Sequence, residues 1–535
     1  MSEKVSTASV SGGVFARASS GLVRTVSTFD TFFYCLVQLA ITFVFFQIAY
    51  WFVYPGAQME VAGIIALAIA LLEGVTYGLF TSVYPRSGGE YVPLSRATHP
   101  FIGFVASFSN TFWQIYFTGT IVQFATTMGV APLFAALGLQ TGSDALFNLG
   151  MWFDTPVGWF VFGVVMIFLF CYQLYRGMRT YFRVQKWLFG ISLICYVIFL
   201  VVLFMGATGV FSFEVSYDKY FGGGAYAQLL ADARSLGADL NPPIDWKVTL
   251  WFTIWPAWSF FFAVLSTAFS GEIKNVERGQ LIAIPMAQVI GGILLILTGL
   301  LARLAISTEG LIAAGWVSDA LPENFPLPYP WISTLASVMA DNVLLTIIIN
   351  FAVIVMTTYV AASTAIYGTR GLLAWGIDGM APEWLGKVSE RFRSPTNAII
   401  VTGVVATIAL AIYSFTDWLR FLQGMAGMGL VFLVTTFAAA IFPFIKRETY
   451  EASPARIEVA GIPLITLTGI PGSLGLAYVV YRVIVDSDYG ANAPISMAMF
   501  IAVFVVGAIW YFVARAIRRS QGVDMDARFE EIPIE

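Results

Sequence analysis

Long apolar runs alternate with short polar turns along most of the chain. Runs such as "VAGIIALAIALL" lie in apolar stretches of about 20 residues, the length that an α-helix needs to cross a bilayer. They lack the alternation of polar and apolar residues, in strands of about 10, that a membrane-spanning β-barrel shows. The predicted spans are 31–53, 61–84, 98–128, 155–175, 183–207, 248–270, 281–305, 340–368, 397–415, 418–443, 461–483 and 494–516. This pattern predicts an all-α polytopic membrane protein with about 12 transmembrane helices.

The composition supports this class and excludes others. The chain is 58% hydrophobic and only 11% charged, with a mean hydropathy of +0.80, whereas soluble domains carry about 25% charged residues. The chain contains no HExxH, P-loop or GxSxG signature, and its one histidine, His99, lies at the edge of a span. Its three cysteines lie in apolar runs without a disulfide or CxxC pattern. We therefore predict no enzyme activity, no cofactor and no nucleic-acid partner, which leaves transport, conduction or sensing.

The distribution of charge predicts how the chain is oriented. Most of the 28 lysine and arginine residues fall in the tails and in alternate turns, and aspartates collect in the turns between. Because basic residues favour the cytoplasmic side of a membrane, both termini are predicted to be cytoplasmic and the protein to lie in the plasma membrane. The predicted division is a tail (1–29), five spans (30–207), an outer loop (208–247), five spans (248–443), two further spans (444–516) and a tail (517–535).

Four motifs in consistent order identify a family. They are "YPRSGGEYVPLSR" (84–96), "GMRTYFRVQKW" (177–187), "SGEIKNVERGQLIAIPMA" (270–287) and "GTRGLLAWGIDGMAPEWLGKVSERFRSPTNAI" (368–399). The first is a turn after the second span, where Gly88 and Gly89 permit unusual backbone angles and Pro85 ends the helix. Together the four resemble the amino acid–polyamine–organocation (APC) transporter superfamily, whose members carry similar segments at these places.

The resemblance implies a LeuT-like 5+5 inverted repeat whose first and sixth spans are broken at the membrane centre. Broken helices expose backbone N–H groups to an anion and carbonyl groups to a cation, which suits an amino acid. Residues 41–45 occupy the place of the family's glycine-rich turn, and residues 262–264 that of its second turn. Neither segment has glycine, and the β-branched Ile41 and Thr42 resist unusual backbone angles. Because Pro256 removes a helical hydrogen bond, we expect the sixth span to break near Trp258 and Ser259 instead.

Candidate substrate-binding residues follow from their depth and chemistry in the first, third and sixth spans. Aromatic rings there suit an apolar substrate body or a cation, although such residues also serve as ordinary packing. The candidates are Gln38, Ile41, Thr42, Phe43, Asn110, Trp113, Trp255, Trp258, Ser259 and Phe260, with Gln47, Gln114 and Tyr116 nearby.

Candidate ion-coupling residues fall into two sets. Glu73 stands mid-span, where an uncompensated charge costs roughly 2.5–3.5 kcal/mol, so it is either a proton-binding group, a cap for a broken helix or a hydrogen-bonded packing residue. Proton-coupled relatives carry a lysine in the fifth span, and Ser192 takes that place. A sodium ion would instead use carbonyl and hydroxyl oxygens. That second set comprises Val37, Ala40, Thr357, Thr358, Ser363 and Thr364.

These observations favour a secondary active transporter, an amino acid permease that moves amino acids or related organic amines by alternating access. The expected partners are a small-molecule substrate and the lipid bilayer, with Na⁺ or H⁺ as the coupling ion, or exchange without one; the oligomeric state does not follow from the sequence. Two alternatives stay open: a transporter of polyamines or other organic cations, and a nutrient sensor that binds without transport.

Overall fold

The computed structural model describes residues 21–416 and 421–530, so most of the predicted N-terminal tail lies outside the described residues. Within these residues, twelve helical segments are long and apolar enough to cross a membrane, which confirms the predicted class. They are Thr28–Ala49, Met59–Val83, Pro100–Thr141, Pro156–Tyr175, Met178–Ala207, Trp246–Ala268, Val276–Ile306, Val343–Asp378, Thr396–Phe415, Gly424–Ile445, Leu464–Val485 and Pro494–Ser520. The third and eighth extend 10 or more residues beyond their predicted ends of 128 and 368.

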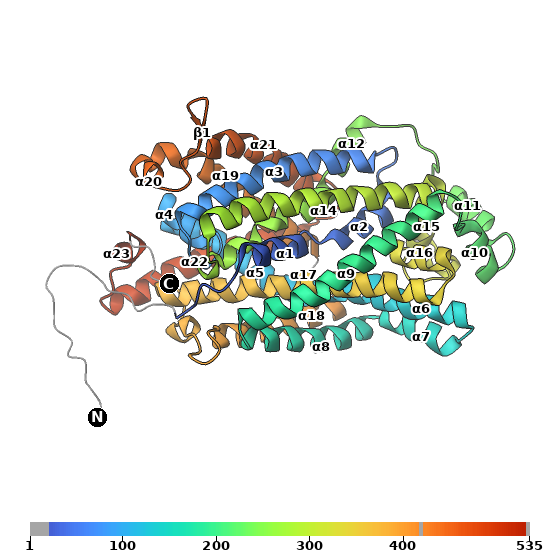
Figure 1. Cartoon of the computed structure of the whole chain (residues 1–535), viewed down its shortest axis with the longest axis horizontal. Coiled ribbons are helices and arrows are strands. Elements are labelled where there is room, and N and C mark those ends of the chain that lie inside the picture. The colour runs from blue at the N-terminus through green and yellow to red at the C-terminus, as the bar shows by residue number, and fades with distance from the viewer. Residues whose placement is uncertain (1–20, 417–420, 531–535) are drawn as a thin grey trace.

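The long helices run along one axis and form a single bundle (Figure 1). They are α3 (Met59–Val83), α5 (Pro100–Ala125), α8 (Pro156–Tyr175), α9 (Met178–Ala207), α14 (Val276–Ile306), α17 (Val343–Asp378), α18 (Thr396–Phe415), α19 (Phe421–Ile445), α21 (Leu464–Val485) and α22 (Pro494–Ser520). The start of α1 (Thr28–Gln38) and the C-terminal α23 (Met525–Glu530) lie toward the same end of the bundle, which we call the terminal end (Figure 1).

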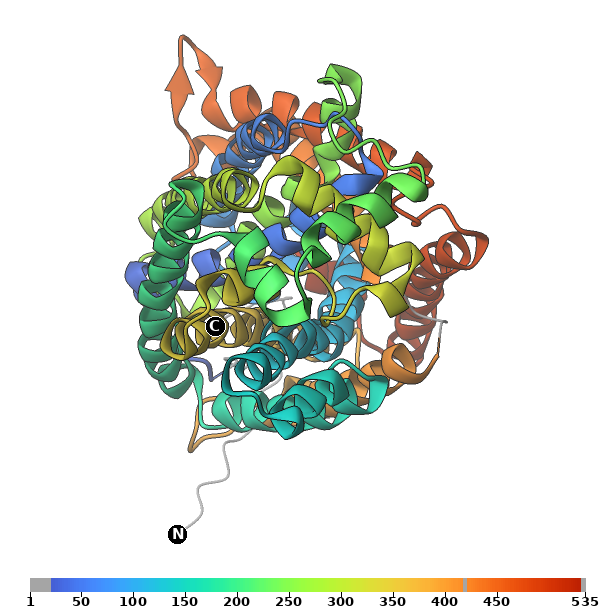
Figure 2. The ribbon, with the colours of Figure 1, turned by 90° about the vertical axis from the view of Figure 1, so that its right-hand side faces the viewer.

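Short helices cover the opposite end, which we call the loop end; Figure 2 looks onto it. The loop after α9 contains α10 (Phe213–Phe221) and α11 (Ala225–Ser235), and the loop after α14 contains α15 (Thr308–Ala320), η6 (Pro322–Asn324) and α16 (Ile332–Ala340). Among the short elements elsewhere in the chain are η2 (Trp51–Val53), α4 (Tyr91–Ala97), η3 (Thr126–Val130), α6 (Ala131–Thr141), α7 (Asp144–Phe153), η7 (Glu383–Gly386), α20 (Arg447–Glu451), β1 (Glu458–Val459) and β2 (Ile462–Pro463).

The first span is interrupted near its middle despite its lack of glycine. Helix α1 ends at Gln38, a short 3₁₀ turn η1 follows (Ile41–Phe43), and α2 continues from Val44 to Ala49. Ala40 takes the left-handed conformation, with φ 47°. Alanine reaches this conformation at a cost of roughly 1–2 kcal/mol, so the β-branched residues that follow can keep ordinary helical angles.

The sixth span is interrupted as well, but not at the residues that we expected from the position of Pro256. Helix α12 (Trp246–Phe252) stops before Thr253, α13 runs unbroken from Ile254 to Phe261, and 3₁₀ turns follow at η4 (Phe262–Ala268) and η5 (Ser270–Glu272). The predicted break near Trp258 and Ser259 is therefore wrong. Proline leaves the carbonyl four residues earlier without its donor, so Pro256 disturbs the helix at Phe252, on its N-terminal side.

The glycine turn of residues 84–96, which the sequence placed after the second span, is largely buried. The N–H of Gly88 donates to the carbonyl of Ala268, where the sixth span ends. Gly89 has φ +63°, and a Cβ there would lie 2.3 Å from the hydroxyl of Tyr367 on α17. The missing side chain therefore lets Tyr367 donate a hydrogen bond to Glu90, which also accepts one from Asn110 at 3.1 Å. The turn joins α3 to α17 and to the interrupted sixth span.

Candidate functional site

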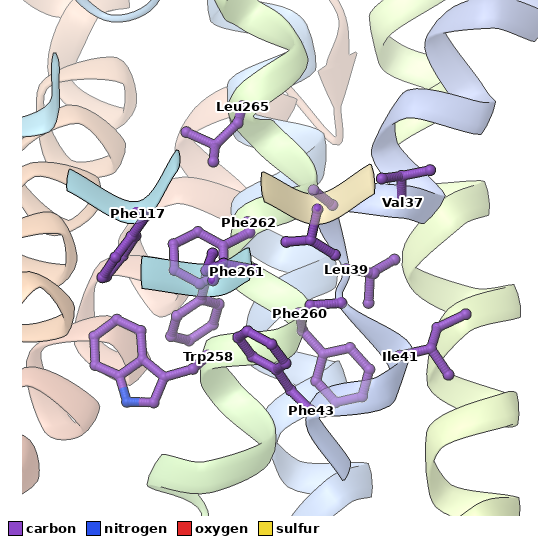
Figure 3. Packing of buried hydrophobic residues seen from close by; sticks show 14 of the residues in the cluster. Val37, Leu39, Ile41, Phe43, Phe117, Trp258, Phe260, Phe261, Phe262 and Leu265 are labelled. Atoms are coloured by element: carbon purple, nitrogen blue, oxygen red, sulfur yellow. The ribbon is translucent and has the colours of Figure 1, made fainter. Parts of the chain in front are cut away.

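A cavity of about 430 Å³ lies between the interrupted spans and the loop end. The two interrupted spans are in contact, and Figure 3 shows the apolar side chains that they contribute, among them Phe43, Trp258 and Phe260. The cavity lining is mainly aromatic. It comprises Phe43, Phe46, Tyr50, Val53, Gln123, Phe124, Thr127, Asp154, Trp159, Trp255, Trp258, Tyr329, Trp331, Tyr413, Met425, Asp488 and Tyr489.

The rings of this cavity hold one another in place. Trp255 stacks on Tyr50, with ring centroids 5.5 Å apart and planes 9° from parallel, and meets Tyr489 edge-on at 5.2 Å. Tyr329 and Trp331 approach to 4.7 Å on the loop side. Such fixed aromatic faces attract a cation or an apolar group.

Polar atoms of the cavity wall lack protein partners. Within the described residues, no hydrogen-bond partner reaches Gln123 Oε1, Thr127 Oγ1, Trp159 Nε1 or Trp331 Nε1, although all four atoms are buried. Because buried polar atoms are nearly always hydrogen-bonded, this wall is suited to a ligand that carries both donors and acceptors.

The two charged side chains of the described lining, Asp154 and Asp488, are both acidic. Asp154 lies in the turn between α7 and α8, and its burial raises the pKa of its carboxyl to about 7, against the opposing effect of the Tyr329 backbone N–H. At neutral pH this group is therefore poised between its charged and neutral forms. A positively charged ligand would favour the carboxylate.

The structure brings only part of the predicted substrate set to this cavity. Phe43, Trp255 and Trp258 line it, and Ile41, Thr42, Ser259 and Phe260 are buried beside them on the same interrupted segments. The other three predicted residues lie elsewhere. Gln38 donates to Tyr34, Asn110 joins the Glu90 cluster, and Trp113 packs where Gly427 leaves room for its indole.

The break in the first span offers two backbone donors. The N–H groups of Ile41 and Thr42 have no acceptor within the part of the chain that the structure describes. They directly precede Phe43, a wall residue of the cavity. Unpaired N–H groups at an interrupted helix suit a carboxylate.

Most of the predicted sodium ligands form hydrogen bonds within the protein. The carbonyls of Val37 and Ala40 accept from the N–H groups of Ala40 and Phe43, at 3.0 and 2.7 Å. The hydroxyl of Thr357 pairs with Thr42 at 2.8 Å, and that of Thr364 lies 3.0 Å from Thr118.

Two further predicted hydroxyls, those of Ser363 and Ser192, donate to backbone carbonyls of their own helices, at 2.7 and 2.8 Å. Thr358 Oγ1 is buried and has no partner among the described residues. The hydroxyls of the eighth span therefore act mainly in helix packing.

Glu73 is fully buried in α3, and neither carboxylate oxygen has a hydrogen-bond partner among the described residues. Its surroundings are close-packed: a Cβ at Gly74 would lie 2.2 Å from Gln288 Oε1 of α14, and one at Gly472 of α21 would lie 3.4 Å from the Glu73 nitrogen. The buried acid Glu90 also acts on it electrostatically. No arginine or lysine in the described structure pairs with Glu73.

Buried ion pairs close the terminal end. Arg370 of α17 binds Glu272 of η5 at 2.9 Å, and Arg96 of α4 binds Asp378 at the end of α17 at 2.9 Å. All four side chains are at most 3% exposed. The partners of Arg370 and Asp378 lie 98 and 282 residues away in the sequence. These pairs hold η5 and α4 against α17 at the terminal end.

Sequence reasoning missed most of the cavity wall. The charge pattern placed Asp154 and Asp488 only among the aspartates of the turns, and no sequence pattern singled out Tyr329 or Trp331. The available signal was the aromatic richness of the segment "LPYPW" next to a buried loop. The segment becomes part of the site only when α16 returns toward the bundle.

Twelve apolar spans among the described residues, with an aromatic cavity between them, define the class of the protein: an integral membrane transporter. Residues 7–509 match the model of the family described as "Amino acid permease". The chain therefore belongs to the amino acid permease family, whose members are transporters and not enzymes. A comparison with curated proteins gave no match.

Proposed function

We propose that this protein is a secondary active transporter that moves amino acids or related organic amines across the plasma membrane by alternating access. The observation that carries the proposal is the aromatic cavity beside the two interrupted spans, in a chain of the amino acid permease family. With both termini cytoplasmic, the cavity lies toward the outside and the ion pairs of Arg370 and Arg96 close the inner side. The structure would then represent a state that accepts substrate from outside.

The lining supports a substrate with an amino group and an apolar or aromatic body. Asp154 and Asp488 are the charged residues of the described wall, and aromatic faces complete it. The N–H groups of Ile41 and Thr42 would meet the carboxylate of an amino acid. An amine without a carboxylate is the second candidate, favoured by the acidic wall.

For the coupling ion we propose a proton rather than sodium. Most of the carbonyls and hydroxyls predicted to bind sodium already form hydrogen bonds within the protein, whereas Glu73 is buried without a partner in the described structure. An ionised carboxylate in such surroundings is costly, so binding and release of a proton at Glu73 would change the relative energies of the transporter's states.

Ligand-induced thermal stabilisation of the purified protein tests the substrate site. A panel of amino acids, monoamines and polyamines would be measured for the wild type, for Trp255→Leu and for Trp187→Leu, whose indole is 72% exposed on α9 and serves as the control. We expect one class of ligand to raise the melting temperature of the wild type and of Trp187→Leu, with the shift lost in Trp255→Leu. Equal shifts in all three proteins would place the substrate elsewhere.

Uptake into liposomes tests the coupling separately. We expect a proton gradient to drive accumulation by the wild type, and replacement of sodium with choline to leave it unchanged. Glu73→Gln should still bind and exchange substrate but no longer respond to the proton gradient. Sodium-dependent uptake that survives Glu73→Gln would exclude the proposed role of Glu73.

A further inference from the structure

A second pocket, of about 400 Å³, opens at the terminal end, away from the aromatic cavity. Three segments build it: residues 23–25 before α1, the turn from α8 into α9, and the loop between α17 and α18. Its described lining comprises Val23, Thr25, Arg176, Gly177, Met178, Arg179, Thr180, Glu272, Arg391, Phe392 and Arg393. We call it the arginine pocket.

Four arginines line this pocket without carboxylate partners. Within the described structure, Arg176, Arg179, Arg391 and Arg393 form no ion pair shorter than 4.0 Å. The guanidinium groups of Arg176 and Arg391 lie instead over the ring of Phe392, 5.5 and 5.0 Å from its centroid. A ring face positions a guanidinium while leaving its N–H donors available.

The backbone fixes the two arginine-bearing segments against each other. Gly177 has φ +94°, and a Cβ there would lie 2.6 Å from the carbonyl oxygen of Phe392, so glycine is required for the close approach. The hydroxyl of Ser394 donates to the carbonyl of Tyr175 at 2.9 Å. Arg393 itself adopts φ +52°, a strained conformation for a residue with a side chain.

The one acid of the described lining, Glu272, is already neutralised. Both of its carboxylate oxygens accept from the guanidinium of Arg370, at 2.9 and 3.3 Å. Gly177 precedes α9 and has no side chain that could accept hydrogen bonds from the first backbone N–H groups of this helix. The pocket is therefore strongly positive and rich in donors.

The geometry points to an anion-binding site in the arginine pocket, one that takes a phosphate group. Several guanidinium groups line one pocket. Each can donate two N–H groups to two oxygens of a phosphate, and each such contact is charge-assisted. Because the pocket contacts the segment before α1, the α8–α9 turn and η5, a bound phosphate would tie together the elements that close the terminal end. The phosphate could come from the head group of an anionic lipid or from a free anion in the cytoplasm.

Binding to the full-length purified protein tests this inference without any transport assay. In one arm, inorganic phosphate is titrated against sodium chloride of equal ionic strength, and stabilisation against heat is measured. In the other arm, the protein is placed in nanodiscs of phosphatidylcholine with or without phosphatidylglycerol. Stabilisation in the first arm identifies a free anion as ligand, and stabilisation only in the second identifies a lipid head group.

The matched variants are Arg391→Gln/Arg393→Gln in the pocket and Arg447→Gln/Arg456→Gln as a control. Both control residues are exposed outside the pocket lining, so the two variants lose the same charge. Each lost charge-assisted contact weakens binding about tenfold. We expect the apparent Kd to rise at least about tenfold in the pocket variant and to stay within about twofold in the control.

Hydrogen–deuterium exchange locates the site. Ligand should protect residues 176–180 and 389–394 in the wild type, and this protection should be lost in the pocket variant. Three results would each overturn the inference: no stabilisation in either arm, an equal loss of binding in both variants, or protection confined to other segments. Since none of these readouts involves the aromatic cavity, failure here leaves the proposed transport function untouched.

Discussion

Gly89→Ala should destabilise the protein more than loss of backbone freedom alone can explain. Gly89 has φ +63°, where a side chain costs roughly 1–2 kcal/mol. A Cβ there would also lie 2.3 Å from the Tyr367 hydroxyl and 2.6 Å from the ring carbon that bears it. The ring must therefore move away, which breaks the hydrogen bond to the buried Glu90, a bond worth about 1.5–3 kcal/mol. The total expected loss is roughly 2.5–5 kcal/mol.

Gly209→Ala is the matched control. Gly209 has φ +80°, but no atom lies within 4 Å of a Cβ at that position, so only the backbone cost of roughly 1–2 kcal/mol applies. The free energy of unfolding would be measured by reversible denaturation in mixed micelles. Tyr367→Phe should destabilise the wild type but have almost no effect in the Gly89→Ala background, because the bond is already lost there. Equal destabilisation by Gly89→Ala and Gly209→Ala would refute the reasoning.

Further predictions concern two charged groups. Because burial raises the pKa of Asp154 to about 7, the affinity for a cationic amine should increase about tenfold from pH 6 to pH 8 as the carboxylate ionises. Calorimetry should show no such pH dependence of the affinity for Asp154→Asn. In the absence of ligand, the free energy of unfolding should fall as pH rises from about 4 to about 7, because Asp154 loses its proton at a lower pH in the unfolded chain than in the folded protein. Arg370→Met leaves Glu272 buried and unpaired, which should cost about 3–5 kcal/mol in denaturation experiments. The double variant Arg370→Met/Glu272→Met should recover most of that loss, and an equally unstable double variant would show that the pair is not the cause.

The spans could be predicted from the sequence because each is determined locally, by a run of apolar residues long enough to cross a bilayer. The motifs around Gly88 and Lys274 likewise identified the family, since they are contiguous. The interruption of the first span was expected at residues 41–45, and the structure places the left-handed residue just before, at Ala40. An alanine gives no local sign that its backbone will adopt that conformation.

The pairing of buried charges could not be predicted. Arg370 and Glu272 are 98 residues apart, and Arg96 and Asp378 are 282 residues apart. Only the packing of the interrupted sixth span and α4 against α17 brings these partners together. The same holds for Asp154, which belongs to the cavity only because a loop more than a hundred residues away folds over it.

The composition of the C-terminal tail did not predict that part of it packs against the bundle. Its acidic residues gave no indication of a packed role, yet Phe529 is buried against the ring of Tyr91, and the Arg96 guanidinium lies 5.2 Å from its centroid. A short helix can thus pack through one aromatic side chain without any hydrophobic periodicity of its own.

The most direct test of the central claim is counterflow in proteoliposomes, with radiolabelled amino acids and amines taken up against the same unlabelled compound inside. The account predicts accumulation by the wild type and by Trp187→Leu, and a loss of about tenfold or more in Trp255→Leu, in keeping with the removal of one desolvated cation–π contact. If no amino acid or amine accumulated, or if Trp255→Leu accumulated as much as the wild type, the aromatic cavity would not be the transport site.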